Sequence, residues 1–323
     1  LEAFLTQENI NRFRMPSEGH RGGPWYHVLG LVVLFAPWSV FLLQAVWYGA
    51  RAVRSDKTSD ARSDSPDKYK FLAVWILAYL VFFSVAATKL PNYVLPVYPA
   101  LAVLVARILD RWRVGALEFP GWMVAASTAG AILFGALLSA GLLFAGGVIS
   151  PPVPVKGFHP LPALGPYAWL GIIPLVAGLA FGWLAKTGRR DAALTAFAAG
   201  AVLLLAIVAA FPTVAMNEYK VPRYFAEEVG LRQTDRDIRI VTCRWFRHSL
   251  VFYVRREVEP IDDFEKLERA LALPRPTYLL VPDDVWPELS KKLAVPMKEI
   301  TRHYDFYARH EIVVLANEYA TRD

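Results

Sequence analysis

The feature that most limits how this chain can fold is a series of long runs without Asp, Glu, Lys or Arg. A helix needs about 20 mostly apolar residues to cross the hydrocarbon core of a bilayer. With 55% hydrophobic residues and a mean hydropathy of +0.32, the chain is more apolar than an ordinary soluble protein. The charge-free runs cover 22–50, 71–88, 90–106, 119–155, 157–185 and 192–217.

These runs predict a polytopic α-helical membrane protein with six transmembrane helices. Charged residues return from Glu218 onward, which indicates a soluble α/β domain at the C-terminus. We therefore expect an outer loop over 1–26, a six-helix region over 27–212 and an α/β domain over 213–323. The helices are expected at about 27–50, 70–88, 92–109, 120–147, 166–186 and 192–212.

Two further patterns describe the membrane region in more detail. Pro37 lies in the middle of the first expected helix and predicts a kink there, because proline removes a helical hydrogen bond. Small residues in the fourth expected helix suit close contact with neighbouring helices. They are Gly130, Gly135, Ser139 and Gly141.

The basic residues of the membrane region lie mostly in alternate loops, which predicts the orientation of the chain. The opposite loops carry only Lys89 and Lys156. The net charge of +6 therefore indicates membrane topology and no nucleic-acid partner. We expect the 1–26 loop, the Lys89 turn and the C-terminal domain on the non-cytoplasmic side, which is the periplasm for a bacterial inner membrane. The basic loops hold Arg51, Arg54, Lys57, Arg62, Lys68, Lys70, Arg107, Arg111, Arg113, Lys186, Arg189 and Arg190.

The C-terminal part alternates short strand and helix signals, which predicts a mixed sheet. It has no glycine-rich phosphate loop, no metal-ligand spacing and no nucleophile elbow. We expect Cys243 to be a small core residue, and His248, His303 and His310 to be structural or on the surface. Strands are expected at 238–243, 257–260, 277–281, 299–307 and 311–317, and helices, the last two with Asp caps, at 246–255, 262–272 and 283–293.

A proline-rich turn, residues 87–99, joins the second and third expected helices and holds a single cation, Lys89. Because the outer loops are otherwise nearly free of cations, topology does not explain this lysine, whereas a phosphate-bearing lipid head group does. Tyr93 follows four residues later and shares a face with Lys89 if the segment is helical. The alternative is a snorkelling lysine in a turn shaped by its prolines.

The N-terminal loop gathers cations and aromatic residues where it enters the first expected helix. Such residues suit anionic lipid head groups at a membrane interface. The alternative is that they are interfacial anchors next to a solvated loop. The residues are Glu8, Asn9, Arg12 and Phe13, followed by His20, Arg21, Trp25, Tyr26 and His27.

Taken in order, these motifs resemble the C-terminal half of the GT-C-type membrane glycosyltransferases, the family of undecaprenyl-phosphate aminoarabinose and dolichyl-phosphate-mannose–protein mannosyl transferases. The resemblance covers residues 1 to about 212, and the outer α/β domain agrees in position and character only. The motifs are Glu8-Asn9-x-x-Arg12-Phe13, His20…Pro24-Trp25-Tyr26, Pro37-Trp38 and Lys89-Leu90-Pro91-x-Tyr93-x-Leu95-Pro96-x-x-Pro99.

The resemblance implies transfer of a sugar from a polyprenyl-phosphate donor to a lipid or protein acceptor, usually with a divalent metal ion. The family's catalytic Asp lies in an outer loop that this chain lacks, so we expect further sequence upstream of Leu1. The family often has Glu-His-Asn where this chain has Gln7-Glu8-Asn9, which leaves His20 and Glu8 as candidate metal ligands. The candidate substrate and phosphate residues are Lys89, Arg12, Arg21, Tyr93, Tyr26 and Asn9.

Two other classes use similar features. A polyprenyl-lipid transporter or flippase would also bind the phosphate, but such proteins place polar groups at the membrane midplane and often contain an internal repeat. The sequence shows neither pattern. A membrane-anchored binding protein would need far fewer helices than the six expected here.

Overall fold

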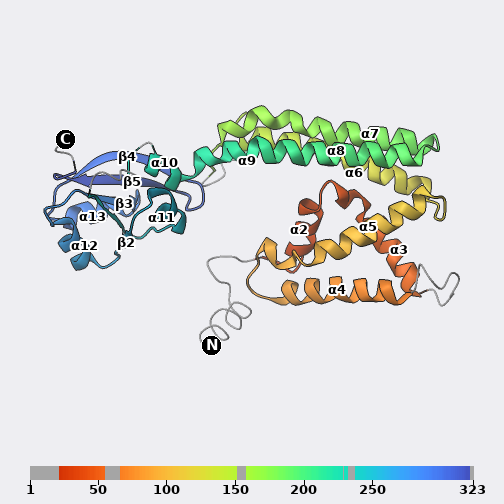
Figure 1. Cartoon of the computed structure of the whole chain (residues 1–323), viewed down its shortest axis with the longest axis horizontal. Helices are drawn as coiled ribbons and strands as arrows, with labels where there is room; N and C mark the ends of the chain where they lie inside the picture. The colour runs from red at the N-terminus through yellow and green to blue at the C-terminus, as the bar shows by residue number, and fades with distance from the viewer. Residues whose placement is uncertain (1–21, 55–65, 151–157, 228, 232–236, 321–323) are drawn as a thin grey trace. The chain divides into compact units, whose positions relative to one another are not determined.

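The computed structural model describes residues 22–54, 66–150, 158–227, 229–231 and 237–320 (Figure 1). The chain divides into two compact units. The first comprises Leu1–Leu143 with Tyr167–Ile207, and the second comprises Phe144–Pro166 with Val208–Asp323. Each unit is described by itself below.

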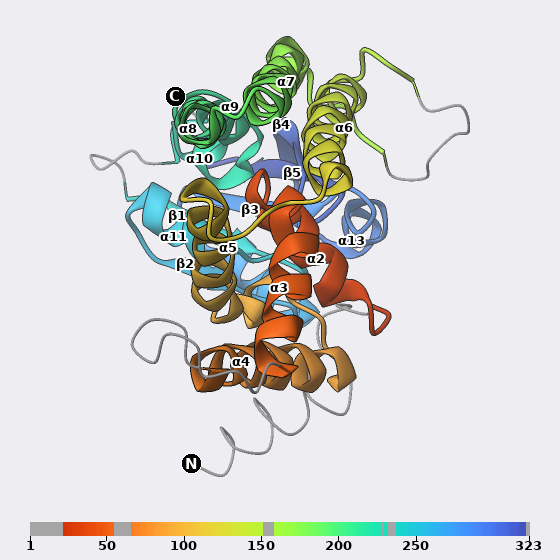
Figure 2. The same ribbon diagram turned by 90° about the vertical axis from the view of Figure 1, so that its right-hand side faces the viewer.

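The first unit is built from helices, some of which continue across its limits. Figure 2 views α6, α7 and α8 from one end, with α7 between the other two. The helices are α2 (Tyr26–Leu34), η2 (Trp38–Phe41), α3 (Leu42–Arg54), α4 (Pro66–Val85), η3 (Pro91–Val94), α5 (Val97–Arg113), α6 (Gly121–Ala145), η4 (Pro162–Gly171), α7 (Ile172–Lys186) and α8 (Arg190–Ala210).

Four helices among the described residues are long and apolar enough to cross a membrane, and a fifth span results if a bent pair counts as one. The bent pair is Tyr26–Leu34 with Trp38–Val53, which turns by 112°, so the kink expected at Pro37 is confirmed. The run expected to span at 92–109 is divided into η3 and α5, which has 17 residues. The helices indicate an integral membrane protein, and the expected sixth span stays a prediction.

Small residues bring α6 into close contact with η4 and the start of α7, as the sequence predicted for Gly135 and Ser139. A Cβ atom added to Gly171 would collide with the backbone oxygen of Gly135, and the Ser139 hydroxyl donates to the Ala168 carbonyl at 2.7 Å. The same expectation is wrong for Gly141, because a Cβ there would have open space around it.

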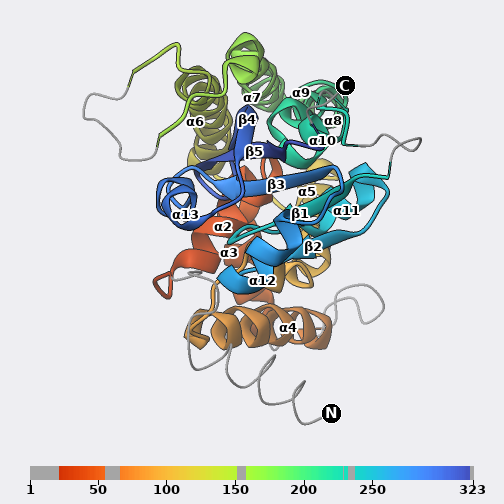
Figure 3. The ribbon, with the colours of Figure 1, turned by 90° about the vertical axis from the view of Figure 1, so that its left-hand side faces the viewer.

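The second unit contains a five-stranded mixed sheet in the order β2-β1-β3-β5-β4 (Figure 3). Strands β2, β1 and β3 are parallel, whereas β5 is antiparallel to both β3 and β4. Its elements are α9 (Pro212–Ala215), η5 (Met216–Tyr219), α10 (Val221–Glu227), β1 (Arg239–Thr242), α11 (His248–Val254), β2 (Val258–Pro260), α12 (Phe264–Leu271), β3 (Thr277–Pro282), α13 (Trp286–Lys292), β4 (Met297–Asp305) and β5 (His310–Asn317).

Alternation along the central strands produces a core on each face of the sheet, because successive strand side chains point to opposite sides. Ile240 packs with residues of α10 and α11, such as Phe225 and Leu250. The next residue, Val241, packs on the other face with Leu267 of α12. Cys243 is buried in this second core, as the sequence predicted.

The first of the two predicted Asp caps is present, and the second is wrong. Asp263 caps α12 by accepting a hydrogen bond from the backbone N–H of Lys266 at 2.9 Å. Helix α13 begins after Val285, which has no side-chain cap. The chain enters α13 through Pro287 at the start of the helix, where proline needs no hydrogen-bond partner for its nitrogen.

Candidate functional site

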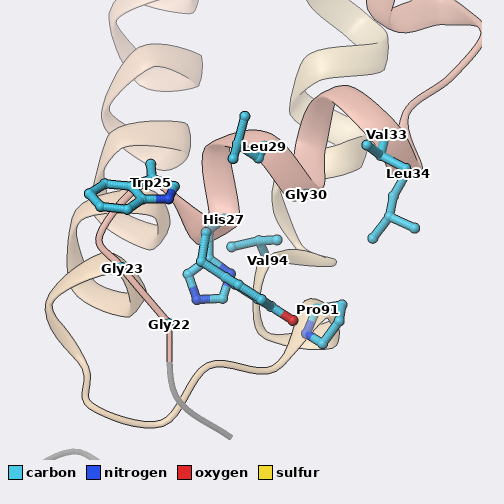
Figure 4. A pocket seen from close by; sticks show the side chains of 11 residues that line it. Gly22, Gly23, Trp25, His27, Leu29, Gly30, Val33, Leu34, Pro91 and Val94 are labelled. Atoms are coloured by element: carbon cyan, nitrogen blue, oxygen red, sulfur yellow. The ribbon is translucent and has the colours of Figure 1, made fainter. Parts of the chain in front are cut away.

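An open cleft of about 460 Å³ lies in the first unit between α2 and η3 (Figure 4). Its lining is mostly apolar, and α2 carries large side chains there that are exposed to their surroundings, with Val33 67% exposed. A cleft of this kind fits an apolar chain and has few groups that would hold a polar molecule. The larger lining side chains include Trp25, Leu29, Val33, Leu34, Pro91 and Val94.

The cleft depends on a close approach between the loop before α2 and the turn after α4. A Cβ atom at Gly22 would lie 3.0 Å from both Lys89 Cγ and Tyr26 Cδ2. Such contacts are tight, so a glycine is what lets the loop lie against the lysine stem. The last part of the N-terminal loop therefore meets the Lys89 turn.

The Lys89 ammonium is buried and fully hydrogen-bonded. It donates to the carbonyl oxygens of Phe83 at 3.0 Å, Ser84 at 2.6 Å and Ala86 at 2.6 Å, and the residue is 4% exposed. Helix α4 ends at Val85, and the last carbonyls of a helix lack backbone donors and carry partial negative charge. In this structure Lys89 therefore caps α4 and points into neither lipid nor solvent.

The turn after Lys89 is a 3-10 helix, which changes the expected relation between Lys89 and Tyr93. Because α4 has ended and η3 begins only at Pro91, the two residues do not share a helical face. They are linked through Phe83, whose ring stacks on Tyr93 at 4.8 Å and whose carbonyl accepts from Lys89.

Of the candidate substrate residues, the structure brings three together. Tyr26 lines the cleft, as does Pro91, the Lys89 stem lies against Gly22, and Tyr93 stacks on the ring of Phe83, whose carbonyl accepts from Lys89. The other candidates lie outside the described residues. They are Asn9, Arg12 and Arg21, together with the candidate metal ligands Glu8 and His20.

His27 is a site residue that the sequence indicated only as one of the interfacial residues of the N-terminal loop. It lines the cleft with 1% exposure, and neither ring nitrogen makes a hydrogen bond of normal geometry to the described residues. Its ring lies 5.1 Å from that of Tyr26 and 6.3 Å from that of Phe83. A buried polar group whose hydrogen bonds fall short of normal geometry is costly, so His27 is a candidate ligand-binding group. The available signal was a lone histidine inside the charge-free run 22–50.

The metal ion that the resemblance implies finds no ligand set among the described residues of the cleft. The described residues do bring Asp283, Asp284 and His310 together, with ligand atoms within 4.8 Å of one another. These residues lie in the second unit, and exposed acidic groups of this kind are common without an ion. Neither the described residues of the cleft nor the group of Asp283, Asp284 and His310 is therefore assigned a catalytic metal ion.

Comparison with solved structures defines the class of fold. The chain matches the crystal structure of ArnT from Cupriavidus metallidurans bound to undecaprenyl phosphate, with a TM-score of 0.72 and 17% identity over 100% of this chain and 57% of that one. The apo structure of the same protein gives 0.65, with 19% identity over 98% of this chain and 57% of that one. The chain therefore has the fold of the matched part of ArnT, and it spans 57% of the length of that protein.

Sequence comparison identifies the relatives within that class. The chain is 30% identical over 205 residues to the undecaprenyl phosphate-α-4-amino-4-deoxy-L-arabinose arabinosyl transferase of Serratia proteamaculans, which covers 64% of this chain and 34% of the relative. It is 35% identical over 103 residues to the enzyme of the same name from Yersinia pestis, covering 32% and 17%. The chain thus matches about a third or less of these relatives' length. No protein-family model matches the sequence.

Proposed function

We propose that this chain is part of an integral-membrane glycosyltransferase that moves a sugar from a polyprenyl-phosphate donor to a lipid or protein acceptor on the non-cytoplasmic side. The apolar cleft between α2 and η3 carries the proposal. It suits the isoprenoid part of such a donor. The buried His27 lines it, and the Lys89 stem lies against Gly22, another residue of its lining. The similarity to an ArnT structure bound to undecaprenyl phosphate supports the same ligand class.

The proposed transfer requires positive charge beside the lipid phosphate, because negative charge develops on this leaving group as its bond to the sugar breaks. Lys89, Arg12 and Arg21 are the proposed cations, with arginine able to hold two phosphate oxygens at once. All three ammonium hydrogens of Lys89 are donated to carbonyl oxygens in this structure. Direct contact with phosphate thus requires it to exchange one carbonyl for a phosphate oxygen.

Polar side chains would orient the donor. Tyr26, Tyr93 and Asn9 supply hydrogen bonds to the sugar or phosphate, and His27 adds two ring nitrogens. A divalent metal, held by His20 and Glu8, would supply further positive charge. The acceptor hydroxyl requires a general base, a role that the resemblance gives to an Asp in another segment.

The proposal includes an arrangement in the membrane. Six spans within 27–212 would place the 1–26 loop, the Lys89 turn and the 213–323 domain on the periplasmic side of a bacterial inner membrane. The partners are then membrane lipids, the lipid-linked sugar donor and the acceptor. The concentration of basic residues in the alternate loops supports this orientation.

Two substitutions on the same helix test the cleft. Val33 lines it, whereas Val32 is also exposed on α2 but does not line it. We expect Val33→Trp to fill the cleft and weaken undecaprenyl phosphate binding about tenfold, or about 1.4 kcal/mol. Val32→Trp should bind like the wild type. Binding is measured by native mass spectrometry of the detergent-solubilised protein.

The outcome separates the proposal from its alternatives. Equal binding by both variants would place the donor elsewhere. Sugar transfer by the protein expressed from its natural gene, assayed with polyprenyl-phosphate sugar, separates an enzyme from a transporter or a binding protein. Transfer lost in Val33→Trp and kept in Val32→Trp supports the enzyme, while lipid movement across vesicles without transfer contradicts it.

A further inference from the structure

A second pocket, of about 340 Å³, lies entirely within the second unit. Its lining differs from that of the first cleft because it combines two cations with three hydroxyl groups. Polar groups of this kind, converging on one hollow, are what fix the orientation of a small polar ligand. The pocket is lined by Lys220, Arg247, Ser249, Tyr253, Asp305 and Tyr307.

A buried carboxylate holds the pocket in shape. Asp305, 1% exposed, accepts hydrogen bonds from Trp245 Nε1 at 2.8 Å and Arg247 Nε at 3.3 Å through one oxygen. Its other oxygen accepts from the backbone N–H groups of Tyr307 at 2.9 Å and Ala308 at 3.3 Å. Asp305 therefore fixes the turn between β4 and β5 and one edge of the Arg247 guanidinium.

The remaining cationic donors of the pocket are available to a ligand. Arg247 uses Nε on Asp305, and neither of its Nη atoms has a hydrogen bond to the described residues. Its guanidinium carbon lies 5.8 Å from the centre of the Tyr307 ring. Lys220 makes no side-chain hydrogen bond or ion pair within the described part of the chain. The neighbouring pocket differs, since its Arg223 is paired with Glu227 at 3.0 Å.

We propose that this pocket binds a sugar phosphate. The Arg247 Nη groups and the Lys220 ammonium hold the phosphate oxygens, because a guanidinium fits two oxygens and an ammonium adds a point charge. Ser249 and Tyr253 supply hydroxyls for the sugar, and the exposed Tyr307 ring supplies a flat apolar surface for it. With Asp305 counted, the lining keeps a net positive charge.

The site is independent of the transfer reaction proposed above, because it concerns binding within the second unit alone. Its test is calorimetric titration of the full chain in detergent with glucose 1-phosphate. The comparison ligands are glucose, inorganic phosphate and glycerol 3-phosphate, the last standing for a lipid head group. We expect glucose 1-phosphate to bind tightest, phosphate and glycerol 3-phosphate to bind about tenfold more weakly, and glucose not to bind.

Three variants connect binding to the pocket. We expect Arg247→Gln and Lys220→Gln each to weaken glucose 1-phosphate binding about tenfold. Arg223→Gln, which removes the same charge from the neighbouring pocket, should change binding less than twofold. Lys220→Gln is the decisive variant, because the Lys220 side chain has no hydrogen bond or ion pair in the described structure whose loss would affect folding, and its backbone hydrogen bonds are unchanged.

Each contrary result overturns a stated part of the proposal. Unchanged binding in Lys220→Gln, with an unchanged melting temperature, would show that the phosphate is bound elsewhere. Equal affinity for glycerol 3-phosphate and glucose 1-phosphate would remove the sugar from the assignment. Absence of measurable binding by any of the phosphate compounds would overturn the site altogether.

Discussion

The Lys89 ammonium lies 2.6 Å from the carbonyl oxygen of Ala86, and the same group also caps the carbonyls of Phe83 and Ser84. One cation thereby bonds to the carbonyls at the C-terminal end of α4, next to Gly22 in the lining of the cleft. Because its stem lies against Gly22, it also connects the turn to the loop before α2. These connections make Lys89 important for stability, and donor binding is the role that we propose for it.

Replacing Lys89 by Met keeps the apolar stem and removes the ammonium. We expect sugar transfer to fall by at least about a hundredfold, or about 2.7 kcal/mol, and the melting temperature to drop because three helix-end carbonyls lose their donor. Transfer and thermal unfolding are measured on the same preparation. Lys70→Met, at the exposed start of α4, is the matched control. Wild-type turnover in Lys89→Met would remove Lys89 from the site.

His27→Phe separates ligand binding from stability, because the two effects have opposite signs. The substitution removes two buried ring nitrogens that lack normal hydrogen bonds and keeps an aromatic ring. We therefore expect an unchanged or higher melting temperature. Undecaprenyl phosphate should bind about tenfold more weakly, or about 1.4 kcal/mol, if the ring bonds to the donor. Native mass spectrometry measures the binding, and full affinity with raised stability would make His27 a purely structural residue.

The elements that the sequence predicted correctly are those set by local patterns. Pro37 predicts a kink because a proline inside a helix removes a backbone hydrogen bond. Asp263 caps α12 because a carboxylate before a helix accepts from its first N–H groups. Consecutive apolar residues such as Ile240 and Val241 likewise predict a strand, and in the structure both faces of that strand are buried.

The features that the sequence could not predict depend on how the chain returns on itself. The charge of Lys89 and its place in a proline-rich turn predict a phosphate contact, but its contact with Ala86 depends on the direction that the chain takes after α4 ends. His27 carries no spacing signal, so only its burial in the cleft marks it. Gly135 and Gly141 look alike in sequence, yet only Gly135 faces α7, because helix rotation is set by packing.

That difference between the two glycines gives a stability prediction. Gly171→Ala would press a methyl group against the Gly135 backbone and the Ser139 hydroxyl, so α6 and α7 must separate. We expect a destabilisation of about 1–3 kcal/mol, typical of overpacking. Gly141→Ala has open space and should be neutral or slightly stabilising, because alanine favours helix. Thermal unfolding in detergent compares the two, and an equal loss in both would contradict the close contact.

The pair formed by Arg239 and Glu259 predicts a pH-dependent stability in the second unit. The two residues lie on the neighbouring strands β1 and β2, and Arg239 Nε donates to Glu259 Oε1 at 2.6 Å. This hydrogen bond, together with the nearby positive charge, lowers the pKa of the Glu259 carboxyl in the folded state. A carboxyl with a depressed folded pKa stabilises the fold at pH values above its unfolded pKa, which is about 4.3.

The stabilisation must therefore be present at neutral pH and disappear as the pH falls through the folded pKa of Glu259. We expect Glu259→Gln to lower the free energy of unfolding by about 1 kcal/mol at pH 7, a modest value because the carboxylate is 35% exposed. The difference in the free energy of unfolding between wild type and Glu259→Gln should decrease steadily below pH 4. Glu265→Gln, whose side chain is 86% exposed, serves as the control with no such difference at either pH. A difference for Glu259→Gln that stays constant down to pH 3 would mean that packing, and not the charge of Glu259, stabilises this edge of the sheet.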